Sequence, residues 1–260
     1  MSTQITTELV KELRDSTGVS IMQCKRALEE AEGDMEKALL ILKKKSSDIA
    51  MKKADRDAHE GIIVVVGDDK KTVLLTLHCE TDFVAKNSDF TTLAQNLAEK
   101  ALKEGVENIN EASLPMINEI VQKVGEKIEL GKVELYEGNT IGNYVHAGKS
   151  AVIVSLEGGD KDLAKDIAMH IAAMKPAYTT REEVKEEEVN KVKELFAKEV
   201  DESGKPEDIK AKMLQGKIDT YFKEQTLVDQ PFVKNPDITI GNLLLQKGAK
   251  LLKFSRESIG

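Results

Sequence analysis

The residues best suited to binding chemistry stand together at positions 78–87, in the sequence HCETDFVAKN. They follow a β-rich run at 72–77 and precede a helical pattern, so the sequence predicts a turn between a strand and a helix. Such a turn presents side chains outward from a rigid base. Asp82 beside Phe83 joins a charge to a large apolar ring, which suits recognition better than burial in a core. The competing interpretation is structural, with Asp82 capping the helix and Phe83 folded under the preceding hairpin.

Histidine and cysteine residues offer other chemistry. His78 and Cys79 could form a base and a nucleophile, but neighbours on a strand point to opposite faces and cannot easily form a hydrogen bond. His146 is expected at the tip of a second hairpin, where a lone histidine is usually exposed to solvent. His170 stands in a helical run rich in Ala and Met, which predicts a packed, hydrogen-bonded side chain. We therefore expect no catalytic residues and no covalent chemistry by the chain itself.

The composition argues against several classes of function. The chain has 260 residues, with 38 Lys and Arg against 46 Asp and Glu and a formal net charge of −8, which argues against direct binding of nucleic acid. Its two cysteines lie far apart without metal-ligand spacing, so no metal site or other cofactor is expected. Gly158-Gly159-Asp160 is not a phosphate-binding motif, so the chain should bind no nucleotide itself. The lack of a signal peptide or a membrane-length apolar run predicts a cytoplasmic protein that binds no membrane.

Helix-capping signals divide the N-terminal segment into three short helices. The first ends before Gly18, the second opens at Ser20 with a capping box formed with the residue three positions later, and the third follows Asp34. Apolar residues recur on one face of each helix. We therefore predict a three-helix bundle of the ubiquitin-associated type at residues 1–46 and a polar helical connector at 47–60.

Two β-rich segments at 61–67 and 71–79 flank a short polar turn, which predicts a hairpin. A helical pattern follows at 88–105. Another helix is expected at 113–125, with Pro115 tolerated in its first turn.

The same order, a hairpin and then a helix, recurs at 140–146, 150–156 and 162–174. This weak internal repeat predicts an α+β fold with a duplicated core, in which antiparallel sheets pack on helices. We expect the first core subdomain at residues 61–139 and the second at 140–260.

A helical hairpin is expected inside the second subdomain, at about residues 181–225. Thr180 begins a capping-box pattern, a narrow apolar stripe follows, and residues 203–206 interrupt it before a return stripe. Two amphipathic helices joined by a Gly-Pro turn would protrude from the core. Beyond them, we expect a helix from 239 to 248 and a short strand at 251–254.

Several separate motifs of this chain resemble the translation elongation factor Ts family and follow one another in the order typical of that family. The resemblance runs from about residue 5 to residue 256. The motifs are TDFV at 81–84, KELR at 11–14, TG at 17–18, CKRAL at 24–28, QPFV at 230–233 and TIGNLL at 239–244.

The resemblance implies both a fold and a site. It implies the ubiquitin-associated-type bundle and the duplicated core described above. It also implies that the turn contacts a GTPase, elongation factor Tu, beside its magnesium site. Phe83 would enter a pocket, and Asp82 would act near the groups that hold Mg²⁺ and phosphate. Thr81 and Val84 would set and pack the turn. The resemblance marks three secondary partner-binding residues: His146, Ile21 and Met22, the last two in an apolar patch.

Two hypotheses of function follow. The resemblance implies a guanine-nucleotide exchange factor of translation elongation, which binds elongation factor Tu with GDP and promotes GDP release by disturbing the Mg²⁺ and phosphate site. The alternative is a non-catalytic adaptor or chaperone-like binding protein that uses its ubiquitin-associated-type bundle, and a hydrolase ranks third. Acceleration of GDP release would distinguish the first hypothesis from the others.

Overall fold

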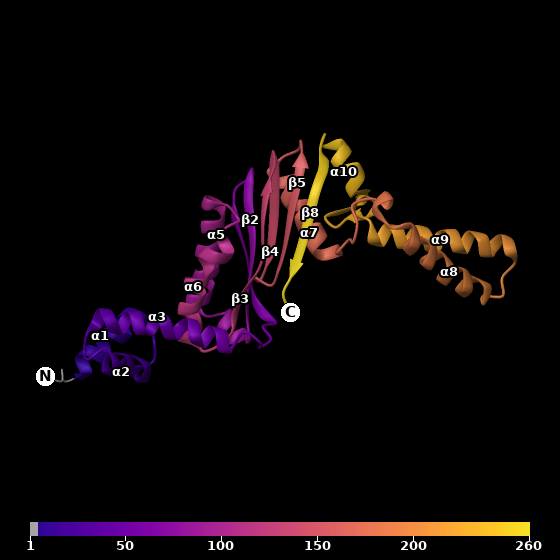
Figure 1. Cartoon of the computed structure of the whole chain (residues 1–260). Helices are drawn as coiled ribbons and strands as arrows, with labels where there is room; N and C mark the ends of the chain where they lie inside the picture. The colour runs from indigo at the N-terminus through magenta and orange to yellow at the C-terminus, as the bar shows by residue number, and fades with distance from the viewer. Residues whose placement is uncertain (1–4) are drawn as a thin grey trace. The chain divides into compact units, whose positions relative to one another are not determined.

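The structure, a computed structural model, describes residues 5–260 as a mixed α/β protein with small antiparallel sheets. Its internal contacts divide it into two compact units, which we describe separately (Figure 1). Unit 1 comprises the chain up to residue 136 with residues 145–150 and 257–260, and unit 2 comprises residues 137–144 and 151–256. The elements up to β3 are, in chain order, α1 (Thr7–Thr17), α2 (Ile21–Glu30), α3 (Met35–Lys52), β1 (Glu60–Gly67), β2 (Lys71–Cys79), α4 (Asp82–Ala85), α5 (Ser88–Glu104), α6 (Ile109–Val124) and β3 (Ile128–Glu137).

The helices α1, α2 and α3 begin where the capping signals predict. Asp34 accepts a hydrogen bond from the Lys37 N–H, and Gly18 ends α1 in the left-handed conformation, at φ 66°. The capping box at Ser20 is only half formed, because Ser20 accepts from the Gln23 N–H while the buried Gln23 Oε1 has no partner. The three helices enclose an apolar cluster whose fully buried members are Leu13, Cys24, Ala27, Leu28 and Ala38.

Helix α3 continues without a break to Lys52, so the first part of the predicted helical connector at 47–60 belongs to α3. Its extension is explained by packing, because Ile49 and Ala50 contact the main apolar cluster of unit 1. A segment that looks polar in sequence therefore gains its helical structure from contacts with distant residues.

The predicted hairpin of β1 and β2 is confirmed. The strands pair antiparallel with Ile62 opposite Leu77, and the sheet order is β1-β2-β3. Six consecutive residues of β2, 72–77, are buried, as expected for a central strand. The third strand, β3, was not foreseen from the sequence.

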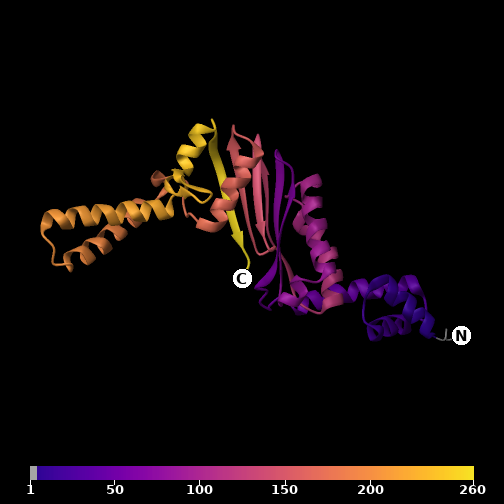
Figure 2. The same cartoon turned by 180° about the vertical axis from the view of Figure 1, so that it is seen from behind.

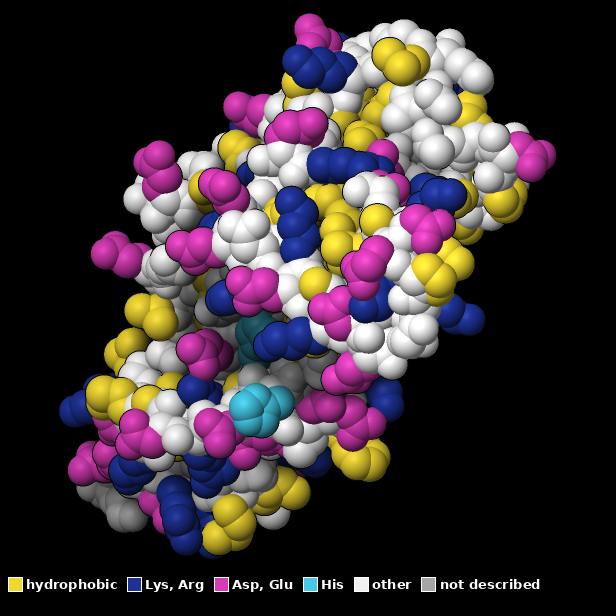
Figure 3. Space-filling view, turned by 90° about the vertical axis from the view of Figure 1, so that its right-hand side faces the viewer, with side chains coloured by type: hydrophobic (Ala, Val, Ile, Leu, Met, Phe, Trp, Pro, Cys, Tyr) yellow, Lys and Arg dark blue, Asp and Glu magenta, His cyan; other side chains and the backbone are white. Residues whose placement is uncertain are grey.

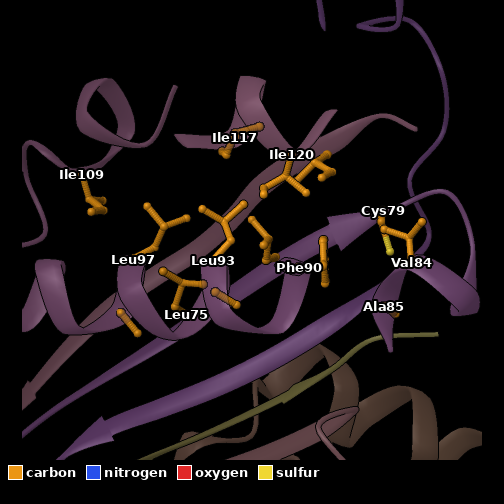
Figure 4. Close-up of a cluster of buried hydrophobic side chains, with 14 of the residues drawn as sticks. Leu75, Cys79, Val84, Ala85, Phe90, Leu93, Leu97, Ile109, Ile117 and Ile120 are labelled. Carbon is orange, nitrogen blue, oxygen red and sulfur yellow. The ribbon is translucent and has the colours of Figure 1, made fainter. Parts of the chain in front are cut away.

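Helix α5 lies across β1 and β2, and α6 packs beside α5 (Figure 1). Figure 4 shows Phe90 and Leu93 of α5 between Leu75 of β2 and the α6 side chains Ile117 and Ile120. Asn87 caps α5 by accepting from the Asp89 N–H.

The prediction for the start of α6 was wrong. This helix begins at Ile109, so Pro115 lies inside the helix and beyond its first turn. All three isoleucines of α6 belong to the unit 1 cluster, and burial of Ile109 favours the longer helix despite the proline.

The remaining elements run from β4 to β8. The segment Val145–Ser150, the tip of the β4–β5 hairpin, belongs to unit 1, where the Ile63 N–H donates to the Gly148 carbonyl over 2.7 Å. Ala147 and Gly148 have φ values of 51° and 67°, which gives the tight turn its glycine requirement. The elements are β4 (Thr140–His146), β5 (Ser150–Glu157), α7 (Lys161–Met174), η1 (Arg181–Glu183), α8 (Glu186–Asp201), α9 (Glu207–Gln225), η2 (Leu227–Asp229), β6 (Pro231–Phe232), β7 (Asn235–Thr239), α10 (Ile240–Gln246) and β8 (Lys250–Ser258).

In unit 2, helix α7 packs against the sheet of order β4-β5-β8 (Figure 2). The approach is close, since a Cβ atom added to Gly142 would lie 2.3 Å from the backbone carbon of Ala164. Asp160 caps α7 by accepting from the Leu163 N–H, which explains the Gly-Gly-Asp sequence without a phosphate ligand. The strand β8 is longer than the predicted strand at 251–254.

The helices α8 and α9 lie side by side and extend beyond the sheet of unit 2 in both views (Figures 1 and 2). The capping-box prediction at Thr180 was wrong, because Glu183 accepts instead from the Thr179 N–H and α8 begins only at Glu186. We call α8 and α9 together the α8–α9 arm. The residues just before and just after the arm lie side by side. Tyr178 forms a bridge with Thr226, and the Leu227 N–H donates to the Tyr178 carbonyl over 2.9 Å.

Among the described residues, no helix is long and apolar enough to cross a membrane.

Candidate functional site

The candidate site is the turn between β2 and α5, which contains the one-turn helix α4. Thr81 is the N-cap of α4, in an extended conformation, and its Oγ1 accepts from the Val84 N–H over 3.4 Å. The Ala85 N–H and the Lys86 N–H donate to the carbonyls of Thr81 and Asp82. Thr81 is therefore the residue that caps this turn, and Asp82 stands free of that role.

The turn points two neighbouring apolar residues in opposite directions. Val84 is 8% exposed and packs into the core with Ala85 (Figure 4). The Phe83 residue, in contrast, is 82% exposed. The interpretation that Phe83 is folded under the hairpin is therefore excluded. An exposed aromatic on an ordered turn is a typical interface anchor.

Asp82 presents a carboxylate beside this ring. The Lys86 ammonium donates to Asp82 Oδ2 over 2.7 Å, and this hydrogen bond is the main cause that lowers the pKa of Asp82. The nearby Lys149 ammonium lowers it further. The carboxylate is thus ionised at neutral pH and remains half exposed.

The long-range hydrogen bonds that hold the turn were missed by the sequence analysis. Glu126, in the connection from α6 to β3, accepts from both the N–H and the Oγ1 hydroxyl of Thr81. Glu80 accepts from the Lys127 N–H and from Arg56. No local sequence signal marks these pairs, because each joins residues that are distant along the chain.

The neighbours His78 and Cys79 do not act together. Cys79 is buried and its Sγ donates to the Thr81 carbonyl over 3.2 Å, and burial, with a contribution from Glu126, raises the pKa of its thiol to about 11. The His78 ring lies against Gly131 of β3, and burial lowers its pKa. Cys79 is therefore a protonated core thiol at neutral pH and is poorly suited as a nucleophile.

The secondary candidates are exposed surface residues. Ile21 and Met22 stand in the first turn of α2 with 54% and 57% of their surface exposed. His146 is exposed at the end of β4. Lys149 of the same hairpin tip forms an ion pair with Glu60, so this tip and the Asp82 carboxylate are brought together within unit 1.

His170 is confirmed as a packed histidine. It is fully buried, its Nδ1 accepts from the Val233 N–H over 3.2 Å, and its Nε2 therefore carries the proton toward Gln230 Oε1 at 2.9 Å. Burial lowers its pKa. Within residues 5–260, no group of three or more His, Cys, Asp or Glu side chains could hold a metal ion.

Charges of both signs are interspersed on the face drawn in Figure 3, where acidic and basic side chains alternate.

Similarity to known proteins identifies the family of this chain. The family model described as Elongation factor TS matches residues 80–260. This chain belongs to the elongation factor Ts family. Its relatives include the elongation factor Ts of Alkalilimnicola ehrlichii, which is 42% identical over 269 residues, or 98% of this chain and 92% of that protein. The proteins of the same name from Thioalkalivibrio sulfidiphilus and Legionella pneumophila (strain Paris) are 43% and 40% identical, over 98% and 100% of this chain and 92% and 93% of their own lengths.

Family membership over nearly the whole length assigns the biological role. The chain is a guanine-nucleotide exchange factor of translation elongation. The motif TDFV at 81–84 lies at the beginning of the matched region, on the exposed turn described above.

Proposed function

We propose that this chain binds the GTPase elongation factor Tu in its GDP form and promotes GDP release through the turn Thr81–Val84. The observation that carries the proposal is the 82% exposed ring of Phe83 on a turn whose backbone is held by hydrogen bonds. An aromatic ring that costs no unfolding to expose can enter a pocket of a partner with little loss of conformational entropy.

The two side chains of the turn have different roles in the proposal. Phe83 anchors the complex by burying its ring in the partner. The ionised Asp82 approaches the Mg²⁺ and phosphate site of the GTPase. Its carboxylate there disturbs the coordination of Mg²⁺, which depends on close geometry. Thr81 and Val84 hold the turn in place, Thr81 as the cap of α4 and Val84 through its contacts in the core.

Ile21, Met22 and His146 contribute secondary contacts to the same partner. The three-helix region then acts as a ubiquitin-associated-type recruiting module, and the hairpin tip of His146 supports the Asp82 turn. The exposure of all three side chains leaves them available to a partner. The chain itself performs no covalent chemistry and binds no nucleotide, nucleic acid or membrane. Its place of action is the cytoplasm, where elongation takes place.

This mechanism makes the chain and GDP mutual antagonists on the GTPase. The factor by which the chain lowers GDP affinity must equal the factor by which GDP lowers the affinity for the chain. The chain need only bind the nucleotide-free form better than the GDP form. Raising Mg²⁺ should favour the nucleotide-bound GTPase and dissociate the binary complex.

The test uses purified elongation factor Tu loaded with fluorescent GDP. We expect the chain to accelerate release of the fluorescent nucleotide, and its affinity in calorimetric titrations to fall as GDP and Mg²⁺ rise. An affinity independent of both would overturn the mechanism. Binding without any acceleration would instead favour the adaptor hypothesis.

A further inference from the structure

Two segments exchange hydrogen bonds beneath the recognition turn. Glu126 accepts from the Thr81 N–H over 3.0 Å with Oε2 and from the Thr81 hydroxyl over 2.6 Å with Oε1. In return, Glu80 accepts from the Lys127 N–H over 2.6 Å. We call these four residues, Glu80, Thr81, Glu126 and Lys127, the carboxylate bracket. It ties the end of β2 to the connection between α6 and β3.

We propose that Glu126 is a positioning residue for nucleotide exchange: it fixes Thr81 so that the turn presents Phe83 in one orientation. The inference rests on the function proposed above for the turn. Glu126 itself would not touch the GTPase nucleotide site.

The Phe83 ring cannot fix its own position. It is almost fully exposed, so packing within the chain does not determine where the ring points. Helix α4 has only 4 residues, and an isolated helix of that length is unstable without outside support. The orientation of the ring is therefore set by the backbone, which is held at Val84 in the core and at Thr81 in the bracket.

The Thr81 hydroxyl links the bracket to the helix. It donates its proton to Glu126 Oε1 and accepts from the Val84 N–H at the same time. A carboxylate is the right partner, since it can accept from two donors of one residue in charge-assisted bonds. Without Glu126, the Thr81 N–H loses its acceptor and the hydroxyl is free to rotate away from Val84.

The bracket is also fastened to the segment that leaves α3. Arg56 donates to both Glu80 oxygens, at 3.2 Å each, and Lys53 donates to the Gly125 carbonyl next to Glu126. Glu80 and the residue before Glu126 are thereby bonded to the segment that follows α3.

The first part of the test measures GDP release from elongation factor Tu against the concentration of the full chain, for wild type and Glu126→Ala. If the competent orientation falls to a tenth of the population, half-maximal exchange should need about tenfold more Glu126→Ala protein. The maximal rate at saturation should change less. Glu126→Gln, which keeps an acceptor for the Thr81 N–H, should restore much of the affinity.

The matched control is Glu129→Ala, because Glu129 pairs with Lys127 over 2.7 Å in the same region without contacting Thr81. It should behave as wild type.

The second part separates positioning from general stability. In the double variant Phe83→Ala with Glu126→Ala, the loss of Glu126 should add less than about twofold to the effect of Phe83→Ala, because a missing ring needs no orientation. Hydrogen exchange should show faster exchange at residues 81–86 in Glu126→Ala and unchanged protection in β1 and β2. This readout is independent of the GTPase, so it also covers a variant with weakened folding.

Each result decides between the two claims. Full, independent losses in the double variant, or a Glu126→Ala protein with wild-type exchange while Phe83→Ala is impaired, would overturn the positioning role and leave the proposed function intact. Wild-type exchange by Phe83→Ala would overturn the proposed function and the positioning role with it. A loss at Phe83 that masks the loss at Glu126 supports both.

Discussion

Replacing Phe83 with Ala should impair exchange strongly without weakening the fold. The ring is 82% exposed, so its removal leaves no cavity. The free energy of unfolding should change by no more than about 0.5 kcal/mol, as is usual for surface substitutions. Loss of an aromatic anchor typically costs about 2 kcal/mol or more in binding, which corresponds to roughly 30-fold in affinity.

Phe90 provides the matched control seven residues further along. Its ring is fully buried in the core of unit 1 between α5, α6 and the sheet (Figure 4). Phe90→Ala should therefore destabilise the chain by about 3–5 kcal/mol, through loss of apolar burial and the cavity left behind. The two variants remove the same atoms from opposite environments.

The assay combines two measurements on each variant. Stopped-flow release of fluorescent GDP gives the exchange activity, and urea denaturation gives the free energy of unfolding. For Phe83→Ala we expect about 30-fold weaker activity at subsaturating concentrations with an unchanged unfolding midpoint. Wild-type release would refute the anchor role. A large shift of the midpoint would refute the conclusion that the ring is free of the core.

Three other predictions follow from the described side chains. Ile21→Ala with Met22→Ala should weaken binding of the GTPase in calorimetric titrations without changing the unfolding midpoint, and unchanged affinity would contradict a recruiting role. Burial lowers the pKa of His170 below its ordinary 6.5, so the unfolded state binds the extra proton first and stability should fall as the pH drops below about 6.5, by at most ~1.4 kcal/mol per pH unit. Denaturation of wild type and His170→Gln at pH 7.5 and 5.5 tests this, and equal losses in both proteins would count against it. Cys79, with a thiol pKa of about 11, should resist alkylation in the native chain at pH 8 and react after unfolding, as followed by mass spectrometry.

The features that the sequence predicted well are local ones. Ser20 and Asp34 each cap a helix by accepting a hydrogen bond from the backbone N–H three positions ahead. A capping side chain and the backbone N–H that donates to it lie within one turn, so the local sequence contains the whole interaction. The β1–β2 hairpin was accessible for the same reason, since a short polar turn separates two β-rich runs.

The features that were missed depend on distant partners. β3 has charged residues along much of its length and becomes a strand by pairing with β2, about 50 residues earlier in the chain. A helical segment after residue 46 was predicted, but its continuity with α3 and its end at Lys52 were not, because Ile49 and Ala50 pack on the distant unit 1 core. Pro115 suggested the start of a helix by a valid local rule, which the core contacts of α6 override.

The candidate site divides in the same way. The types of Asp82 and Phe83 and their place after a strand pointed to this turn, but the residues alone left the buried interpretation of Phe83 open, and the structure shows its ring exposed. Glu126 could not be found, because it lies 45 residues from Thr81 and is an ordinary glutamate in its own local sequence. What a turn presents was visible in the sequence, and what holds the turn was not.

The pairing of the two ends of the α8–α9 arm has a consequence for how this part of the chain can change. The bridge between Tyr178 and Thr226 and the bond from Leu227 to Tyr178 bring the two ends of the arm side by side. The core of unit 2 therefore needs only a connection between neighbouring positions there, whatever lies between them. Because the entropy of closing a connection grows slowly with its length, arms of very different size can be fitted at this point at little cost to the core. The α8–α9 arm can therefore be replaced by one of another length without rebuilding the core of unit 2.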